Sequence, residues 1–250
     1  MTEDPFSLDG KTILVTGASS GIGRGVAVAC AEQGAVLVIS GRNEERLQAT
    51  LASLSGSGHR SIAADLTDTE QLRRLADECG PIDGLFFSAG IAAIAPFRMI
   101  SEKHLRNVMS IDFEAPVMLT QRLLQRKQVR AGGSIVFNTA MAVKNSPAGS
   151  AIESAAKAAL TAASRSLALE VAQDRIRVTC LECGYVRTEM LEQLKQTGMD
   201  PEQLASHTPL GMGTVEDASN AAVFLLSQAS RWISRTALTM DGGLSLRISH

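Results

Sequence analysis

Two side chains of opposite charge stand four residues apart in a segment that is expected to be helical. Glu153 precedes Lys157 in the run Glu-Ser-Ala-Ala-Lys, and this spacing allows an ion pair on one face of a helix. Such a pair lowers the pKa of the carboxyl group, whereas burial raises it, and the sequence leaves this balance open. A carboxylate suits alcohol oxidation or proton abstraction beside a carbonyl, whereas ketone reduction needs a proton donor. The other interpretation is an ordinary salt bridge without a catalytic role.

A glycine-rich turn near the N-terminus has the residue types that bind a phosphate group. The apolar run Ile13-Leu14-Val15 leads into the turn, and a helical pattern follows it. Because glycine has no side chain, backbone N–H groups and the positive end of the helix can approach a pyrophosphate. The strand, turn and helix context makes a dinucleotide site credible. We expect contacts to the dinucleotide from Gly17, Ser19, Ser20, Gly21, Ile22 and Gly23.

The end of the second expected strand predicts which dinucleotide binds. A site for NAD(H) usually offers a carboxylate there to the ribose 2′-hydroxyl, and the run Ser40-Gly41-Arg42 has none. Arg42, together with Arg24 just past the glycine turn, can instead meet a 2′-phosphate, because a guanidinium group matches phosphate oxygens. We therefore expect NADP(H) rather than NAD(H). The alternative for each arginine is a solvated surface residue.

The segments that must position these groups alternate between strand and helix patterns. Helical spacing of apolar residues marks 21–33 and 43–54, and β-rich runs cover 11–16, 35–40, 60–64, 82–88, 134–138, 175–181 and 236–240. This alternation predicts an α/β fold with one doubly wound parallel sheet covered by helices on both faces. We expect residues 1–250 to form a single domain. The least regular stretch, 184–213, contains Gly198 and is predicted to form a substrate lid.

Composition limits the partners. The chain has 250 residues and a net charge of -2, and its 24 lysines and arginines are scattered, so no attraction to nucleic acid or to an anionic membrane is indicated. The N-terminus is acidic, and no apolar run approaches the ~20 residues that span a bilayer. We expect a cytoplasmic protein whose partners are small molecules or copies of itself.

Cys180 and Cys183 have the C-x-x-C spacing of some metal and redox sites. No second ligand pair follows at a zinc-like interval, and Cys180 ends an apolar run that is typical of a buried strand. We therefore interpret the cysteines as reduced and buried, and we expect no metal site.

Further motifs, in order along nearly the whole chain, resemble those of the short-chain dehydrogenases/reductases, especially the 3-oxoacyl and sugar reductase branches. The resemblance implies a Rossmann-type fold and a nicotinamide coenzyme. It assigns Asp65-Leu66 to the adenine, and Gly184 with Thr188 to the loop that holds the nicotinamide amide. The other motifs of the resemblance are Ser88-Ala89-Gly90 and Asp241-Gly242-Gly243.

The family reaction uses an asparagine, a serine, a tyrosine and a lysine, which the resemblance places at Asp112, Ala140, Glu153 and Lys157. Only the lysine is retained, and the resemblance implies that it also holds the coenzyme ribose. A shift of one residue would supply a hydroxyl from Thr139. No shift supplies the tyrosine, because the one tyrosine of the chain is Tyr185. The like charge of Asp112 would raise the pKa of Glu153.

Other titratable side chains are candidates for the missing proton donor. Tyr185 follows Gly184 in the loop assigned to the nicotinamide, from which it could protonate the opposite side of a substrate. Without a lysine neighbour its pKa stays near ~10, and a packing or substrate-contacting role is the alternative. His104 and His207 titrate near neutral pH, and the alternative for both is a solvated side chain.

We therefore expect an NADP(H)-dependent oxidoreductase that acts on a hydroxyl or carbonyl through an atypical site around Glu153, Lys157 and Asp112. One alternative is a non-redox protein that binds NADP(H) or supports an active paralogue, and another is an isomerase or dehydratase. The resemblance also implies a homotetramer built partly from the helix at 151–172. The small residues on that helix are Ala155, Ala158, Ala159, Ala162 and Ala163.

Overall fold

Seven parallel strands form one sheet. The computed structural model describes residues 4–193 and 200–246. The strand order is β3-β2-β1-β4-β5-β6-β7, and each neighbouring pair is parallel. The order reverses between β1 and β4, and ligands of doubly wound sheets bind at such a reversal. The strands are β1 (Thr12–Thr16), β2 (Val36–Gly41), β3 (Arg60–Ala63), β4 (Ile82–Phe87), β5 (Val129–Ala140), β6 (Arg177–Cys183) and β7 (Thr236–Met240).

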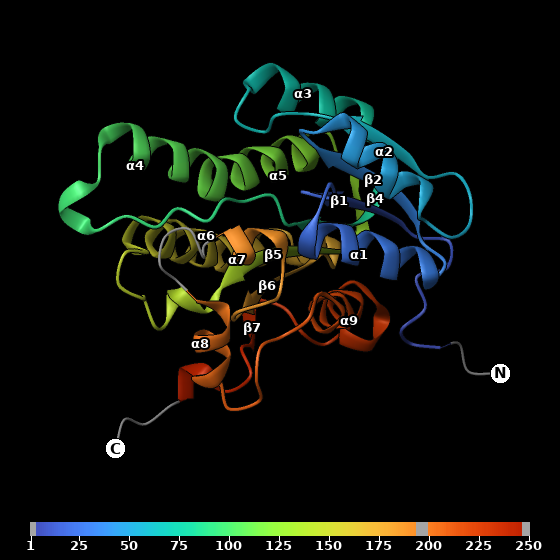
Figure 1. Cartoon of the computed structure of the whole chain (residues 1–250). Helices are drawn as coiled ribbons and strands as arrows, with labels where there is room; N and C mark the ends of the chain where they lie inside the picture. The colour runs from blue at the N-terminus through green and yellow to red at the C-terminus, as the bar shows by residue number, and fades with distance from the viewer. Residues whose placement is uncertain (1–3, 194–199, 247–250) are drawn as a thin grey trace.

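Helices cover both faces of this sheet (Figure 1). No helix among the described residues is both long and apolar enough to cross a membrane. The helices are α1 (Gly21–Glu32), α2 (Glu44–Ala52), α3 (Thr69–Glu78), α4 (Glu102–Met109), α5 (Ala115–Gln125), α6 (Ala151–Glu170), α7 (Glu189–Gln193), α8 (Pro201–Ser206) and α9 (Val215–Leu226).

The alternation of side chains along each strand divides the core into two layers. Leu14 packs with α3, α5 and α6 on one face, whereas Ile13 and Val15 pack with α1 and α9 on the other. Because successive strand side chains point to opposite faces, a strand that is apolar throughout must be buried on both. β1 and its neighbours have this pattern.

The α/β architecture and all seven predicted strands are confirmed, with differences at their ends. β5 begins at Val129, five residues before the predicted start, because a register shift against β4 lets it pass through a glycine pair. β6 continues to Cys183, two residues beyond its predicted end. β5 likewise continues to Ala140, two residues beyond its predicted end, so both strands reach further towards the carboxyl edge of the sheet, where the site lies.

The segment predicted to be the least regular is more helical than expected. It contains α7 and α8, each capped at its start, by Thr188 and Asp200 respectively. The prediction rested on glycines and prolines, but Pro201 occupies the first turn of α8, where proline is well tolerated. Gly198 and the rest of 194–199 lie outside the described residues.

Candidate active site

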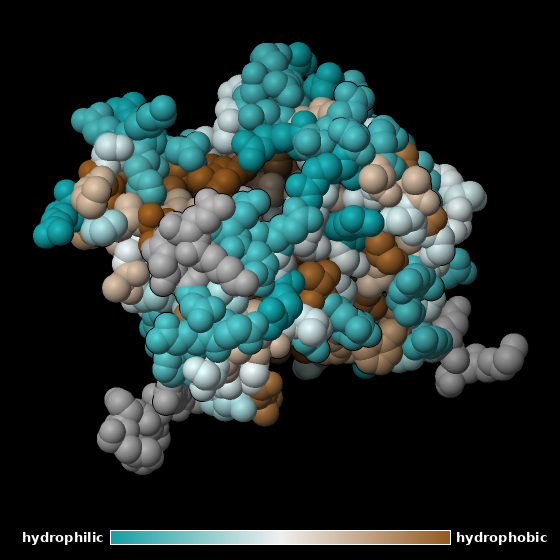
Figure 2. All heavy atoms as spheres, in the orientation of Figure 1, coloured by the Kyte–Doolittle hydropathy of each residue, from teal (hydrophilic) through white to brown (hydrophobic). Residues whose placement is uncertain are grey.

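A cavity of about 720 Å³ lies at the carboxyl ends of the strands, around the point where the strand order reverses. Figure 2 shows apolar surface bordering the hollow between α4, α5 and α7. The cavity joins the glycine turn to the charged residues of α6. Of the predicted site residues, those that line it are Gly17, Ser19, Ser20, Gly21, Ile22, Gly23, Arg42, Leu66, Ala89, Gly90, Asp112, Glu153, Lys157, Gly184, Tyr185 and Thr188.

The glycine turn has the geometry of a phosphate site. Ser20 precedes α1 in an extended conformation, and its side chain does not cap the helix, so the first N–H groups of α1 are free to bind a ligand. A Cβ atom on Gly17 would lie 2.7 Å from the backbone nitrogen of Ala89, and one on Gly23 would collide with the carbonyl of Gly17. The close packing of β1, α1 and the end of β4 therefore requires these glycines.

A second feature shows that the turn suits a polar ligand. The hydroxyl of Ser19 is buried and has no hydrogen-bond partner, and a Cβ atom on Gly41 would collide with it. A buried hydroxyl without a partner is costly, and an acceptor such as a phosphate or ribose oxygen would satisfy it. The residues present at this end of the cavity thus fit a dinucleotide.

The start of α7 closes over the turn. The Oγ1 atom of Thr188 accepts a hydrogen bond of 3.3 Å from the N–H of Leu191, and its methyl group would lie 3.5 Å from a Cβ atom on Gly21. The structure thereby brings Thr188 from the segment after β6 against the phosphate turn after β1. Gly184 is equally confined, because a Cβ atom there would lie 2.7 Å from Cα of Asp241.

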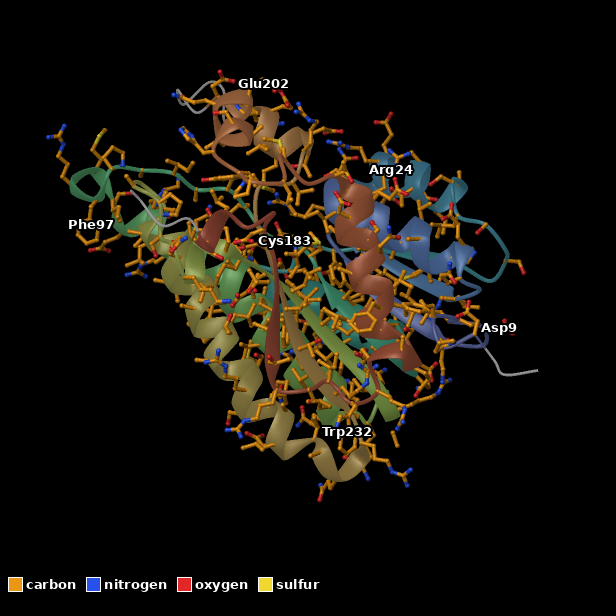
Figure 3. All side chains as sticks on the ribbon, turned by 90° about the horizontal axis from the view of Figure 1, so that it is seen from below. Asp9, Arg24, Phe97, Cys183, Glu202 and Trp232 are labelled. Carbon is orange, nitrogen blue, oxygen red and sulfur yellow. The ribbon has the colours of Figure 1, made fainter. Side chains whose placement is uncertain are left out.

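Two predicted coenzyme contacts fall outside the cavity lining. Arg24 is exposed on α1, towards the periphery of the molecule, whereas Cys183 lies near its centre (Figure 3). Asp65 turns its carboxylate to the N–H and hydroxyl of Thr67. Arg46 lines the cavity beside Arg42 and pairs with Glu189 of α7. The sequence analysis missed Arg46, although it lies one helical turn after Arg42.

The ion pair that the spacing of Glu153 and Lys157 allows does not form in the described part of the chain. Nζ of Lys157 instead donates a hydrogen bond of 2.9 Å to Oδ1 of Asp112, and no ion pair of Glu153 forms among the described residues. The spacing along α6 allows the predicted pair, but Asp112 approaches Lys157 from a second helical segment. Tertiary packing therefore decides the partner of the lysine.

A π-helical segment, η2 (Ser110–Glu114), directs Asp112 inwards between α4 and α5. The Asp112 side chain is completely buried, and its Oδ2 atom has no partner. A Cβ atom on Gly90 would lie 2.7 Å from its Oδ1 atom, so Gly90 leaves room for the Asp112–Lys157 pair. Short π-helical turns often occur at functional sites.

Burial raises the pKa of Glu153 above its ordinary value, and the negative charge of Asp112 adds to the shift. The positive charge of Lys157 and the backbone N–H of Ala93 act in the opposite direction without reversing it. The balance left open by the sequence is thus decided by burial, because Lys157 is already paired with Asp112. Glu153 retains its proton to a higher pH than an ordinary glutamic acid.

Tyr185 lies across the cavity from α6. Burial raises the pKa of its phenol, and the negative charge of Glu153 adds to this effect, so Tyr185 is neutral at physiological pH and can donate a hydrogen bond. Of the two histidine candidates, His207 is exposed and His104 is half-buried near the start of α4. Neither lines the cavity.

The end of β5 shows which residue takes the position assigned to the family serine. Ala140 lines the cavity opposite Cys183. Thr139 also lines the cavity, and its hydroxyl donates a hydrogen bond to the carbonyl of Leu181. Asn138, which the sequence analysis did not consider, lines the cavity and accepts a hydrogen bond from the Cys183 thiol.

The two cysteines of β6 point in opposite directions. Cys180 packs in the core layer of α6, and Cys183 packs in the layer of α1 and α9. Burial raises the pKa of the Cys183 thiol to about 12, so this thiol is protonated at physiological pH. An odd spacing on a strand separates the two sulfur atoms by the thickness of the sheet, and they cannot share one metal ion.

Part of the cavity lining is apolar. No local motif of the sequence identifies this surface, because its residues come from four separate loops and helices that only the fold brings together. Its lining residues are Ile91, Ala92, Ile94, Met141, Ala142, Pro147, Ala148, Met190 and Leu191. A substrate with an apolar body would fit beside the charged residues.

Comparisons with known proteins agree with this geometry. The family model described as enoyl-(acyl carrier protein) reductase matches residues 17–245. The 3-oxoacyl-(acyl-carrier-protein) reductase FabG of Chlamydia pneumoniae is 35% identical over 247 residues, which cover 96% of this chain and 99% of that protein. A solved short chain dehydrogenase/reductase family protein has a TM-score of 0.86 and 30% identity over 96% of this chain and 99% of its own.

A second solved structure carries a ligand. It is described as an NAD(P)-dependent gluconate 5-dehydrogenase from Beutenbergia cavernae with NADP bound at low occupancy. Its TM-score is 0.90 at 31% identity, over 98% of this chain and 100% of its own chain. The likeness extends over nearly the whole chain.

Proposed function

Because the chain belongs to the short-chain dehydrogenase/reductase family, we propose that it transfers hydride between NADP(H) and a hydroxyl or carbonyl substrate, with Glu153 as the proton-transfer group. The observation that carries this proposal is one cavity that contains the glycine turn at one end and Glu153, Lys157 and Asp112 at the other. A single ligand can therefore reach from the phosphate turn to a titratable side chain.

The described residues divide the binding of the coenzyme between them. The N-terminus of α1 and the hydroxyl of Ser19 would hold the pyrophosphate and the adjoining ribose. Arg42, with Arg46 beside it, favours a 2′-phosphate, and the absence of a carboxylate at the end of β2 favours NADP(H) over NAD(H). When bound, the nicotinamide supplies or accepts the hydride.

Glu153 moves the proton in this proposal. Its raised pKa keeps the Glu153 carboxyl group protonated to a higher pH than an ordinary glutamic acid, and a protonated carboxyl group can donate to the oxygen of a carbonyl as that oxygen gains negative charge. In the oxidative direction the ionised form accepts the proton of a hydroxyl. Lys157 and Asp112 compensate each other's charge through their ion pair.

The test is turnover of a panel of ketones and alcohols, with deuterium at nicotinamide C4 to trace the hydride. Ketone reduction by the wild-type protein should fall as the pH rises through the raised pKa of Glu153, and alcohol oxidation should rise. Glu153→Gln should lower kcat by about 100-fold or more, in line with the loss of a general acid. The control is Glu170→Gln, which removes an exposed carboxylate at the far end of the same helix.

The outcome also separates the two alternatives expected from the sequence. Retained NADPH binding without hydride transfer, in the wild type and in Glu153→Gln alike, would favour a non-redox protein. Solvent deuterium in the substrate without net coenzyme consumption would favour an isomerase or dehydratase. Either result would contradict the oxidoreductase proposal.

We also propose that the protein is a homo-oligomer, as a tetramer or a dimer, that uses part of α6. Ala155 and Ala162 are exposed on this helix, and Ala158, Ala159 and Ala163 are half-buried. Small residues at such positions let a second helix pack closely.

A further inference from the structure

Three charged side chains lie close together in the cavity: the carboxyl groups of Asp112 and Glu153 and the ammonium group of Lys157. Lys157 neutralises Asp112 through their hydrogen bond of 2.9 Å, and Glu153 has no cationic partner of its own among the described residues. The phenol of Tyr185, which also interacts with Glu153, keeps its proton and is uncharged. When Glu153 ionises, the site therefore carries one uncompensated negative charge.

We infer that the site accepts a substrate whose reacting carbon is bonded to a cationic nitrogen, so that the protein interconverts a protonated imine and the corresponding amine. This inference rests on the proposed hydride-transfer function and extends it from carbon–oxygen to carbon–nitrogen bonds. The cation would lie against the Glu153 carboxylate and supply the missing positive charge. A partly buried carboxylate gains more from such a partner than an exposed one, because solvent screens it less.

Reduction of a protonated imine suits a site that lacks the tyrosine and the serine of the family reaction. Reduction of a neutral ketone needs a hydride and a proton, whereas a protonated imine already carries its proton on nitrogen. As the new C–H bond forms at the imine carbon, the electron pair of the carbon–nitrogen π bond moves onto nitrogen. The substrate loses its positive charge, and one positive charge remains on the oxidised nicotinamide. No side chain has to donate a proton during this step.

The ionised form of Glu153 is the useful one in this reaction. A carboxylate would stabilise the cationic imine before the transfer. The raised pKa of Glu153 in the free protein fits this interpretation, because it reflects a buried carboxyl group that lacks a cation. The N–H of the substrate can donate a hydrogen bond to the same carboxylate.

The surroundings of Glu153 further restrict the substrate. Ile94, Met141 and Pro147 line the same cavity as Glu153, and the half-buried loop after β4 approaches the loop before α6 through a backbone hydrogen bond from the N–H of Ala95 to the carbonyl of Gly149. An apolar body with one protonated nitrogen matches this combination. We therefore expect cyclic imines and secondary amines with apolar substituents.

The first test measures binding to the coenzyme-free protein and needs no turnover. Calorimetry compares phenylpyrrolidine, a cation at neutral pH, with phenyltetrahydrofuran, a neutral molecule of the same shape. The amine should bind about 30-fold or more tightly, the effect of a desolvated charge partner. This preference should vanish in Glu153→Gln and persist in Glu170→Gln, and both variants are first checked for an unchanged thermal unfolding transition.

A carbon-13 NMR titration of the Glu153 carboxyl group supplies a second readout. Amine binding should lower its pKa, because a cation favours the carboxylate, and the neutral ether should leave it unchanged. Equal affinity for the amine and the ether, or an unchanged pKa, overturns the inference.

Turnover then separates this inference from the proposed function. Reduction of phenylpyrroline with NADPH, at a rate that rises as Glu153 ionises, supports the inference. Reduction of ketones alone, with no preference for the amine, overturns it and leaves the proposed function intact. Failure to reduce either class contradicts the proposed function as well.

Discussion

At the scale of single residues, the site depends on how three charged side chains share their partners. Lys157 donates a buried hydrogen bond to Asp112. Removing either partner would leave an uncompensated buried charge. Glu153 has no ion-pair partner among the described residues, and burial raises its pKa. The proton transfer proposed for the site therefore depends on Glu153.

A stability measurement can detect this raised pKa without any substrate. The folded state holds the Glu153 proton more tightly than the unfolded state, so the wild type loses stability as the pH rises from the ordinary value of 4.5 through the raised pKa. Glutamine does not titrate. Glu153→Gln should therefore gain free energy of unfolding relative to the wild type across this window, and keep the gain at higher pH.

Urea unfolding at a series of pH values measures the difference. The control is Glu170→Gln, whose difference from the wild type should stay nearly constant across the same window. A difference between wild type and Glu153→Gln that shrinks with rising pH would show a lowered pKa and contradict the assignment.

The residues of the site differ in how well the sequence predicts them. The glycines of the turn are predictable, because their spacing after an apolar strand encodes a local structure. The partner of Lys157 is not, because Asp112 lies 45 positions earlier and only the packing of η2 against α6 brings it close. Arg46 and Asn138 were missed because neither belongs to a local motif.

At the scale of the elements, the junction between β1 and α1 positions the coenzyme site. Gly17 has a φ of +67°, and a Cβ atom at this position would meet the backbone that follows β4. Both conditions favour glycine, since other residues rarely adopt this conformation. The first turn of α1 remains open to a ligand.

Gly17→Ala and Gly10→Ala separate these two conditions. Gly10 has nearly the same φ, +68°, but open space around it. Both variants should lose about 1 kcal/mol of stability through the unfavourable conformation. Gly17→Ala should also lose NADPH binding, because its methyl group displaces the backbone at Ala89. Thermal unfolding and calorimetry give the two readouts, and unchanged NADPH affinity in Gly17→Ala would contradict the assignment of the turn.

Strand and helix patterns of the sequence predict the elements better than the connections between them. Each predicted strand is present because its apolar run, which lies between two helical segments, is buried between two layers of helices. The glycines and prolines of 184–213 predict an irregular segment, yet α7 and α8 form within it. Local caps at Thr188 and Asp200 outweigh those residues.

At the scale of the whole molecule, α6 links the site to the proposed oligomer. The face of α6 with Lys157 is buried against η2 and β6, and its other face exposes Ala155 and Ala162. A partner helix on that face would stiffen the element that carries Glu153.

Charge and bulk on the exposed face should therefore reduce the assembly. Ala155→Arg and Ala162→Arg should each shift the mass measured by light scattering towards the monomer, and Ala52→Arg, an exposed position at the end of α2, should not. A wild-type protein that is monomeric at micromolar concentration would contradict the proposed oligomer.

One cavity extends from the start of α1 to α6. The glycine turn, Arg42 and Lys157 come from distant parts of the sequence and line one cavity. Every chemical step proposed for Glu153 requires a coenzyme in that cavity.

Isothermal titration calorimetry with NADPH and NADH tests this requirement most directly. NADPH should bind in a one-to-one ratio to each chain and more tightly than NADH, and Arg42→Ala should weaken NADPH by about tenfold while leaving NADH nearly unchanged, because a charged hydrogen bond is worth about 1.5 kcal/mol or more. The absence of binding heat with both coenzymes, over a range of temperatures, would contradict the account.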